Sequence, residues 1–329
     1  MLLEKLYSED TKMGKKTDNA INILTALKFK GVGNAWIYNN LKGGESIDEI
    51  ISVLNSKNIA ATAYDFNQKR EQVRNVLNTM YKQVDGFDVT ALGDEDFPKI
   101  SGNISAADYP VVLFYKGDIS LIKSTNNNVA VIGVLTPLGD VEQREREVVK
   151  MLVDKGVTIV SGLALGCDSI SHDETLRNHG KTVAVLPSPL NNIMPKSNLR
   201  LANEILESGG LLVTEYYEPI SSKYELSSRY IKRDRLQAMF SKCVLLAASY
   251  AENRDGKDCG SRHALKKAKE YGISRAVIYN EATDKGNDMF DLSRQIIKEG
   301  GAIVVGREKQ ATAVDKICQY KIVEQKNLF

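Results

Sequence analysis

From Val129 onward, short runs of β-branched and apolar residues alternate with longer stretches in which apolar residues recur at helical spacing. The short runs are VAVIG, VTIVSG, TVAVLP, LLVTEY, CVLLAAS, RAVIY and AIVV. They are almost entirely apolar, as strands buried on both faces must be. Most of the helical stretches end at a glycine, which suits a helix C-cap. Strict alternation predicts an α/β fold, with a parallel sheet, right-handed crossovers and helices on both faces.

The region before this alternation has a different pattern. Between Asn19 and Val84 the apolar residues follow helical spacing, without the period of two that marks a strand. We therefore expect a small all-helical domain over residues 1–83, the α/β domain over 84–306 and a short polar tail over 307–329.

Gly31 to Gly33 form a GVG sequence between two of the N-terminal helical stretches. Glycine permits the tight turn of a helix-hairpin-helix, the SAM-like arrangement whose backbone amides can contact DNA phosphates. A plain helix–helix turn explains the same residues, because one GVG is a weak signal and no lysine cluster follows it.

Composition excludes several classes of protein. Lys and Arg (44) nearly balance Asp and Glu (42) in the 329 residues, so any basic surface must be local. Four cysteines without CxxC spacing and three histidines predict no metal site and no disulfide framework. No apolar run approaches the roughly 20 residues of a membrane span. We expect a cytoplasmic protein that has no membrane partner and no cofactor.

The segment VTIVSGLALGCDSISH carries the clearest local signal for a binding site. A strand leads into a loop of small residues, Ser161, Gly162 and Gly166, and then into a helix that Asp168 or Ser169 can cap. Backbone amides in such a loop can approach an anion at the positive end of the helix. Glycines that only shape a tight turn are the commoner reason for such a loop. No G-x-G-x-x-G follows any strand and no Walker A loop is present, which disfavours an NAD enzyme or an ATPase.

The same segment resembles the SGLARGID-x-x-AH signature of the DprA/Smf family of DNA-processing proteins, and further matches follow in order. Met194, Pro195 and Asn198 hold the places of the family's YPxxN motif. Thr214-Glu215 stands for SE, and Arg233 to Arg235 stands for the RNR of FPxRNR. DFPKI, DYPVVLFYKGD and CGSRHAL are similar to further family elements, so the resemblance covers roughly residues 84–306.

The resemblance implies a Rossmann-like domain that binds single-stranded DNA, forms a homodimer and helps to load a RecA-type recombinase. These activities belong to DNA recombination, natural transformation or repair. The matched positions give a set of candidate nucleic-acid or phosphate-binding residues. They are Gly133, Ser161, Gly162, Leu163, Gly166, Asp168, Lys196, Asn198, Arg200, Tyr230, Lys232, Arg233, Arg235, Gly260 and Ser261.

The stretch SSKYELSSRYIKRDR also has the mixture that single-strand binding needs, because cations and aromatic rings alternate within it. By composition alone, a solvated helix face with long basic side chains is the simpler explanation. The position of Arg233 and Arg235 in the matched motif favours the binding interpretation.

Several family features are missing. Gly133-Val134-Leu135 stands where the family has Gly-Ser-Arg, Leu165 replaces an arginine, and Ile231 replaces the proline before RNR. These changes make the expected site less basic. They imply weaker DNA binding, binding through other elements, or a smaller phosphorylated ligand.

Two other classes of function remain as alternatives. The wider superfamily includes sensors and hydrolases of nucleotide-derived ligands, as in phage defence. The hydrolases need a PGGxGTxxE loop, and this chain has DGKDCGSRHAL without that glutamate, so we expect a protein that is not an enzyme. His172 near Asp168 is interpreted as structural. A purely structural partner protein would have no anion site at all.

The C-terminal sequence QKNLF resembles the QxxLF peptide that docks on the bacterial sliding clamp. Gln325, Leu328 and Phe329 are the candidate contacts, and a free terminus suits such docking. Chance matches to so short a pattern are common, and packing of Leu-Phe on the domain is the alternative.

Overall fold

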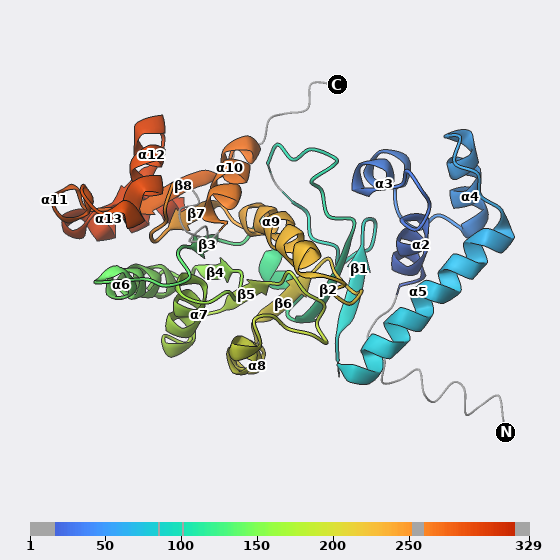
Figure 1. Ribbon diagram of the computed structural model, residues 1–329, viewed down its shortest axis with the longest axis horizontal. Coiled ribbons are helices and arrows are strands. Elements are labelled where there is room, and N and C mark those ends of the chain that lie inside the picture. The colour runs from blue at the N-terminus through green and yellow to red at the C-terminus, as the bar shows by residue number, and fades with distance from the viewer. Residues whose placement is uncertain (1–16, 85, 101, 252–259, 320–329) are drawn as a thin grey trace.

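The computed structural model describes residues 17–84, 86–100, 102–251 and 260–319 of the chain. Figure 1 shows two regions, a group of helices at the N-terminal side and a larger region built around one sheet. In the described part, no helix combines the length and apolar character that crossing a bilayer requires.

The N-terminal region consists of helices α2 (Asp18–Ala26), α3 (Asn34–Asn40), α4 (Ile47–Ser56) and α5 (Ala63–Gln83). Three of these helices begin where a hydroxyl side chain accepts a hydrogen bond from a backbone amide of the first turn, at Thr17, Ser46 and Thr62. The GVG sequence lies between α2 and α3, as expected for a turn between helices. The helical region predicted from periodicity is therefore present.

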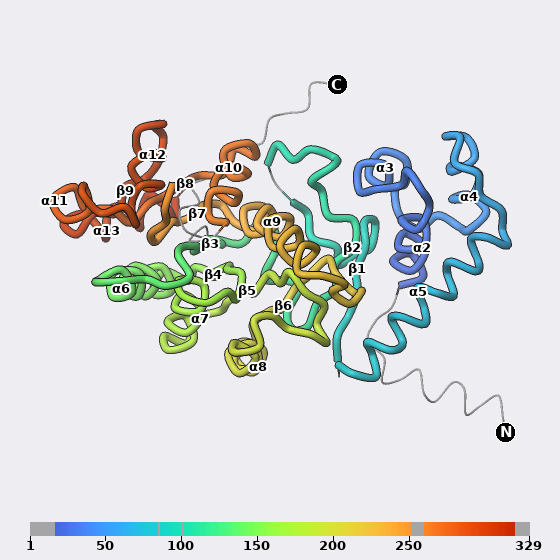
Figure 2. The backbone as a smooth tube through the Cα atoms, viewed as in Figure 1, coloured from blue at the N-terminus to red at the C-terminus, as the bar shows by residue number. Residues whose placement is uncertain are grey.

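These helices are not packed only on one another. Their buried residues share one hydrophobic cluster with Phe87, Val89 and Phe114 at the edge of the sheet and with Tyr217 after its sixth strand. Figure 2 shows α2 beside the first two strands, which it contacts, and α5 packed against α2. The helical region thus covers an edge of the sheet that would otherwise expose apolar side chains.

The larger region contains a nine-stranded sheet of order β1-β2-β6-β5-β4-β3-β7-β8-β9. Its strands are β1 (Asp88–Ala91), β2 (Val112–Gly117), β3 (Asn128–Ile132), β4 (Thr158–Ser161), β5 (Thr182–Val185), β6 (Leu211–Thr214), β7 (Cys243–Leu246), β8 (Ser274–Ile278) and β9 (Ile303–Val305). The seven neighbouring strands β6-β5-β4-β3-β7-β8-β9 all pair parallel. They correspond to the seven runs that the sequence predicts as strands. The predicted α/β fold is confirmed.

Two strands were not predicted. β1 and β2 pair antiparallel with each other, and β2 pairs antiparallel with β6. The expectation of an all-parallel sheet is therefore corrected to a mixed sheet with an antiparallel edge. Phe114 and Thr214 lie opposite each other where the two parts of the sheet join.

Helices cover both faces of the sheet, as right-handed crossovers require. In Figure 1, α6 (Val141–Asp154), α7 (Cys167–Arg177) and α8 (Leu199–Glu207) lie below the strands. Above them lie α9 (Lys223–Met239), α10 (Ser261–Tyr271) and α12 (Asp291–Glu299). Short helical turns complete the chain: η2 (Ile119–Ile122), η3 (Lys196–Asn198), α11 (Glu281–Asp284), η4 (Asp288–Phe290) and η5 (Arg307–Lys309).

The segment expected to be a polar tail differs from that expectation within the described residues. Residues 310–319 form helix α13 (Gln310–Gln319), which contacts β9 and α6. Ala313, Val314 and Ile317 are buried in the main hydrophobic cluster. Their spacing of one, three and four residues is the apolar stripe of a packed helix. Residues 320–329 lie outside the described part of the chain.

The order of strands creates one position in the sheet where a ligand-binding site is expected. From β3 the chain continues to β4, β5 and β6 on one side, and it returns to β7, β8 and β9 on the other. The connections after β3 and β7 therefore diverge at the carboxyl ends of neighbouring strands. Open α/β sheets bind their ligands in the crevice that this divergence opens.

Candidate functional site

A pocket of about 530 Å³ opens at this switch point. It is lined by the end of β3, by the loop between β4 and α7, by one face of α9 and by the first turn of α10. The two segments that the motif matches singled out, around Leu165 and around Arg233, are thus brought together in space. The candidate residues that line the pocket are Gly133, Asp168, Tyr230, Arg233, Gly260 and Ser261.

Arg233 on α9 is the central cation of the pocket. Its side chain is only 3% exposed, and within the described residues it donates no hydrogen bond that satisfies ordinary geometry. Its Nη1 atom lies 3.8 Å from Asp168 Oδ2 and 3.5 Å from Asp234 Oδ1. Its Nε atom has no partner in the described part of the chain. A buried guanidinium with unused donors is costly for the folded protein, which is typical of a site that awaits a ligand.

Gly162 allows the guanidinium to reach this position. A Cβ atom placed on Gly162 would lie 1.5 Å from Arg233 Nη1. Only a residue without a side chain lets the arginine lie flat against the loop after β4. The glycine of the loop therefore positions a cation, which is a different role from offering its amide to an anion.

Asp168 holds the loop after β4 in place. Its Oδ2 accepts hydrogen bonds from the backbone amides of Gly162 (3.1 Å) and Ala164 (3.2 Å). Burial raises the pKa of this carboxyl above its ordinary value, and the nearby charge of Arg233 opposes the rise. The Gly162 amide is already used inside the protein, so the loop does not present it to a ligand.

Other glycines of the pocket permit close packing. A Cβ on Gly133 would lie 2.5 Å from the Sγ atom of Cys167, at the start of α7. Gly166 has φ of +71° and precedes α7, in the left-handed region that suits glycine. Gly260 precedes α10, and a Cβ there would lie 2.8 Å from Asp234 Oδ2. These residues fix how closely the two helices approach the pocket.

Part of the rim of the pocket is apolar. Leu135, Leu165 and Ile231 line the pocket, and each is nearly half exposed, at 46%, 47% and 49%. Leu135 and Leu165 are the positions where the related family has arginine. The ring of Tyr230 lines the same pocket, with its centroid 5.6 Å from Arg233 Cζ. The entrance therefore offers flat and branched apolar surface around a buried cation.

Three candidate residues have internal roles. Ser161 donates its hydroxyl to the carbonyl of Val131, and Leu163 is fully buried. Asn198 donates to the carbonyls of Leu163 and Ala164, so it ties η3 to the loop after β4. These residues shape the pocket wall from behind.

One of the other candidates lines the pocket, and three are exposed cations outside it. Ser261 lines the pocket and donates to the carbonyl of Gly133. Lys196 and Lys232 are exposed and follow the pocket residues Pro195 and Ile231 directly. Arg200 has a side chain that is 88% exposed and pairs with Glu204. These three cations are accessible to solvent but do not line the pocket.

Arg235, matched to the same motif as Arg233, lies away from the pocket. Nη1 and Nη2 form two hydrogen bonds of 2.7 Å with the carboxylate of Glu215, and Nε donates to the carbonyl of Asp108. Glu215 is the second residue of the matched Thr214-Glu215 pair. The two motifs therefore meet in an ion pair inside the protein, and the guanidinium of Arg235 is fully used there.

Replacing Arg235 with alanine is expected to lower the free energy of unfolding by about 3 kcal/mol, because it leaves Glu215, whose side chain is only 14% exposed, without its counter-ion. Chemical denaturation followed by circular dichroism measures this loss. Arg200→Ala provides the control, since an exposed pair contributes roughly 0–1 kcal/mol. Equal stabilities of the two variants would contradict an internal role for Arg235.

Sequence reasoning missed Gln237, which lines the pocket and is 2% exposed. Its amide donates to Asp234 Oδ1, and its Oε1 atom has no partner among the described residues. Gln237 follows Arg233 by four residues, so both lie on one face of α9. Helical periodicity applied to the RNR segment was the signal that could have found it.

His172, interpreted from the sequence as structural, is fully buried on α7. Its Nδ1 atom is 2.7 Å from the hydroxyl oxygen of Thr182. Burial and, to a smaller degree, the charge of Arg233 lower the pKa of His172 to about 3. The imidazole is therefore neutral at pH 7.

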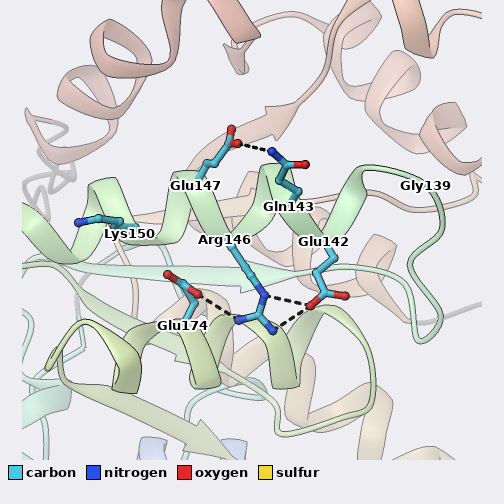
Figure 3. Close-up of a pocket in the computed structure, with 7 residues that line it drawn as sticks. All are labelled: Gly139, Glu142, Gln143, Arg146, Glu147, Lys150 and Glu174. Atoms are coloured by element: carbon cyan, nitrogen blue, oxygen red, sulfur yellow. Dashed lines mark hydrogen bonds and ion pairs between the residues drawn. The ribbon is translucent and has the colours of Figure 1, made fainter.

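A second hollow lies on the outer face of α6 and is shown in Figure 3. Its central residue, Arg146, forms ion pairs with Glu142, Asp173 and Glu174. In Figure 3 its guanidinium points at two of these carboxylates. The charges satisfy one another, and the residues of this hollow do not line the switch-point pocket, so we do not consider it a candidate site.

The described residues contain no group of three or more His, Cys, Asp or Glu arranged to hold a metal ion. The proposed clamp contacts Gln325, Leu328 and Phe329 lie outside the described residues.

The fold and the pocket define an α/β protein with a Rossmann-like open sheet and a candidate ligand site at its switch point. Residues 88–315 match the model of the family described as DNA recombination-mediator protein A, and the chain belongs to that family. The resemblance found from the motifs is thereby confirmed.

Curated relatives agree with this assignment. The chain is 32% identical over 206 residues to the protein Smf of Escherichia coli, which covers 63% of this chain and 51% of the relative. It is 27% identical over 285 residues to the DNA processing protein DprA of Streptococcus pneumoniae, with coverage of 84% and 92%. The chain spans about half the length, or less, of the Smf proteins it matches.

Two solved structures share the fold. DprA from Streptococcus pneumoniae has a TM-score of 0.68 and 23% identity, covering 94% of this chain and 99% of that one. DNA processing protein A from Helicobacter pylori has a TM-score of 0.56 and 25% identity, with coverage of 71% and 98%. The latter structure is described together with that protein's single-stranded DNA binding mode.

Proposed function

We propose that this protein binds single-stranded DNA at the switch-point pocket and acts in DNA processing and recombination. The observation that carries the proposal is Arg233, a guanidinium that is 3% exposed, lines the pocket and has an Nε donor without a partner among the described residues. Arginine that is already buried and held in one orientation loses little entropy on binding and gives strong hydrogen bonds to a polar ligand.

The shape of the pocket favours a single strand over a duplex. A pocket of about 530 Å³ can accept one base that is turned away from its neighbours, whereas the bases of a duplex are stacked and paired. Tyr230 and the apolar rim offer surface on which bases can stack. The exposed cations Lys196, Arg200 and Lys232 are available to the phosphates of a bound strand.

Family membership extends the proposal. Since the family is described as a recombination mediator, we propose that bound single strands are protected and transferred to a RecA-type recombinase, and that the protein acts as a homodimer. Docking on the sliding clamp through Gln325, Leu328 and Phe329 remains a proposal from the sequence alone.

The proposal is tested by fluorescence anisotropy with a labelled oligonucleotide in single-stranded and duplex form over a range of salt concentrations. We expect tighter binding of the single strand, and a fall of log K with log[salt] of about 0.7 for each phosphate contacted. Preference for the duplex, or no binding of either form at low salt, would refute the proposal.

A free nucleotide-derived ligand is the second candidate occupant. The observation in its favour is the loss of the rim arginines, because Leu135 and Leu165 bring no charge to the rim where the family has two cations. In the same titration, a nucleoside monophosphate that binds while oligonucleotides do not would favour a sensor over a DNA-binding protein.

A further inference from the structure

Among the described residues, the buried floor of the pocket carries two carboxylates and one cation, and a second cation, the partly buried Arg262, also lines the pocket. The buried cation is Arg233, and it lies between the two carboxylates, those of Asp168 and Asp234. Both carboxylates line the pocket as well. A phosphate placed against Arg233 would meet this negative charge at short range, in a site screened from water, where like charges repel strongly.

The floor instead suits a neutral group that has acceptors and donors side by side. Arg233 provides N–H donors, and 3.5 Å from its Nη1 atom Asp234 Oδ1 provides an acceptor. Gln237 donates to that same oxygen, which fixes the carboxylate. Its own Oε1 atom, which has no partner in the described part of the chain, adds an acceptor one turn further along α9. The walls above, Leu135, Leu165 and Tyr230, suit the two faces of a flat ring.

Resting on the proposed function, we propose that the pocket takes a nucleobase of the bound strand and selects guanine. Guanine has an acceptor, O6, next to two donors, N1–H and the N2 amino group. Arg233 donates to O6, and the carboxylate of Asp234 accepts from the two donors. A carboxylate has acceptor capacity for these hydrogen bonds in addition to those it already makes.

The other bases fit this arrangement less well. Adenine and cytosine place an amino donor where Arg233 needs an acceptor, and they lack a ring N–H for Asp234. Thymine has one acceptor and one ring N–H, but its second carbonyl would face the carboxylate. A pair of hydrogen bonds to one base edge typically favours the right base over a wrong one by roughly 5- to 150-fold in affinity.

Asp234 is the position at which this chain departs from the asparagine of the RNR motif that it otherwise resembles. Asparagine at this position would offer one amide oxygen and one NH₂ group, so it cannot accept both guanine donors as a carboxylate does. The departure therefore converts a general binding position into one that distinguishes bases. Asp234→Asn is also nearly isosteric, so the variant is expected to fold.

The experiment compares short labelled oligonucleotides of about 10 nucleotides, within the usual site size of single-strand binders. One series is all thymine, and the others carry a single central guanine, inosine, adenine or cytosine. We expect the guanine oligonucleotide to bind about tenfold more tightly than the adenine one. Inosine, which lacks the N2 amino group, is expected to fall between them.

Substitution of Asp234 then tests whether its carboxylate causes the preference for guanine. Asp234→Asn is expected to bring the ratio of guanine to adenine affinity close to one, whereas Asp154→Asn, an exposed carboxylate on α6, leaves the ratio unchanged. Equal binding of all oligonucleotides by the unmodified protein would overturn this inference and leave the proposed function standing. Failure to bind any of them would overturn the proposed function itself.

Discussion

Replacing Arg233 with alanine is expected to weaken binding of single-stranded DNA by about 10- to 100-fold, which corresponds to roughly 1–3 kcal/mol. The side chain supplies the buried donors of the pocket, and alanine leaves two carboxylates facing any ligand. Anisotropy titration at fixed salt measures the loss. Arg233→Lys is expected to recover only part of the affinity, because an ammonium group lacks the planar fork of guanidinium.

A variant that fails to fold would also lose affinity for single-stranded DNA. A second variant that displaces the guanidinium of Arg233 in another way is therefore needed. Gly162→Ala retains the arginine but places a methyl group only 1.5 Å from the position of its Nη1 atom. We expect this variant to lose affinity because the guanidinium is displaced. Both variants must retain the circular dichroism spectrum of the unmodified protein. Unchanged affinity in two folded variants would rule out Arg233 as the central contact.

Replacing Leu135 and Leu165 together with arginine is expected to tighten binding of single-stranded DNA at low salt and to steepen its dependence on salt. Both side chains are about half exposed at the rim of the pocket. Each added arginine that contacts a phosphate increases the slope of log K against log[salt] by about 0.7. The double variant should therefore have a slope steeper by about 1.4, since two contacts are added.

Leu138→Arg is the matched control for this gain. Leu138 is 62% exposed on the same loop as Leu135, but it does not line the pocket. Arginine at position 138 adds the same charge as arginine at position 135, but outside the pocket lining. If Leu138→Arg increases the slope for a single strand as much as Leu135→Arg does, the strand does not pass over the pocket rim.

These predictions depend on a distinction that sequence could not make. Arg233 and Arg235 belong to one motif and received equal weight as candidates, yet only Arg233 lines the pocket. Residues two positions apart on a helix project about 200° apart around its axis. One of the pair therefore faces the pocket while the other faces Glu215, and the choice depends on how α9 is rotated against the sheet.

The antiparallel edge illustrates the same limit for the fold. Local patterns predicted every strand from β3 to β9, because each run is apolar and bounded by helices. β1 has only four residues, and the pairing of β2 with β6 joins residues about 100 positions apart, such as Phe114 and Thr214. A contact at that separation has no local periodic signal. Helix α13 was missed because its short apolar stripe lies within a polar segment.

The amino-acid sequence by itself determined the alternation of strands and helices, the helical N-terminal region, the glycine loop after β4 and the membership of the family. These follow from local periodicity and from motifs in a fixed order. Only the tertiary structure decided which cation is buried with a donor that has no partner among the described residues, which amides are already bonded, and that an aspartate flanks the arginine on the pocket floor. The physical reason is that burial and hydrogen-bond partners depend on long-range packing, which places Gly162 against Arg233 although 71 positions separate them in the chain.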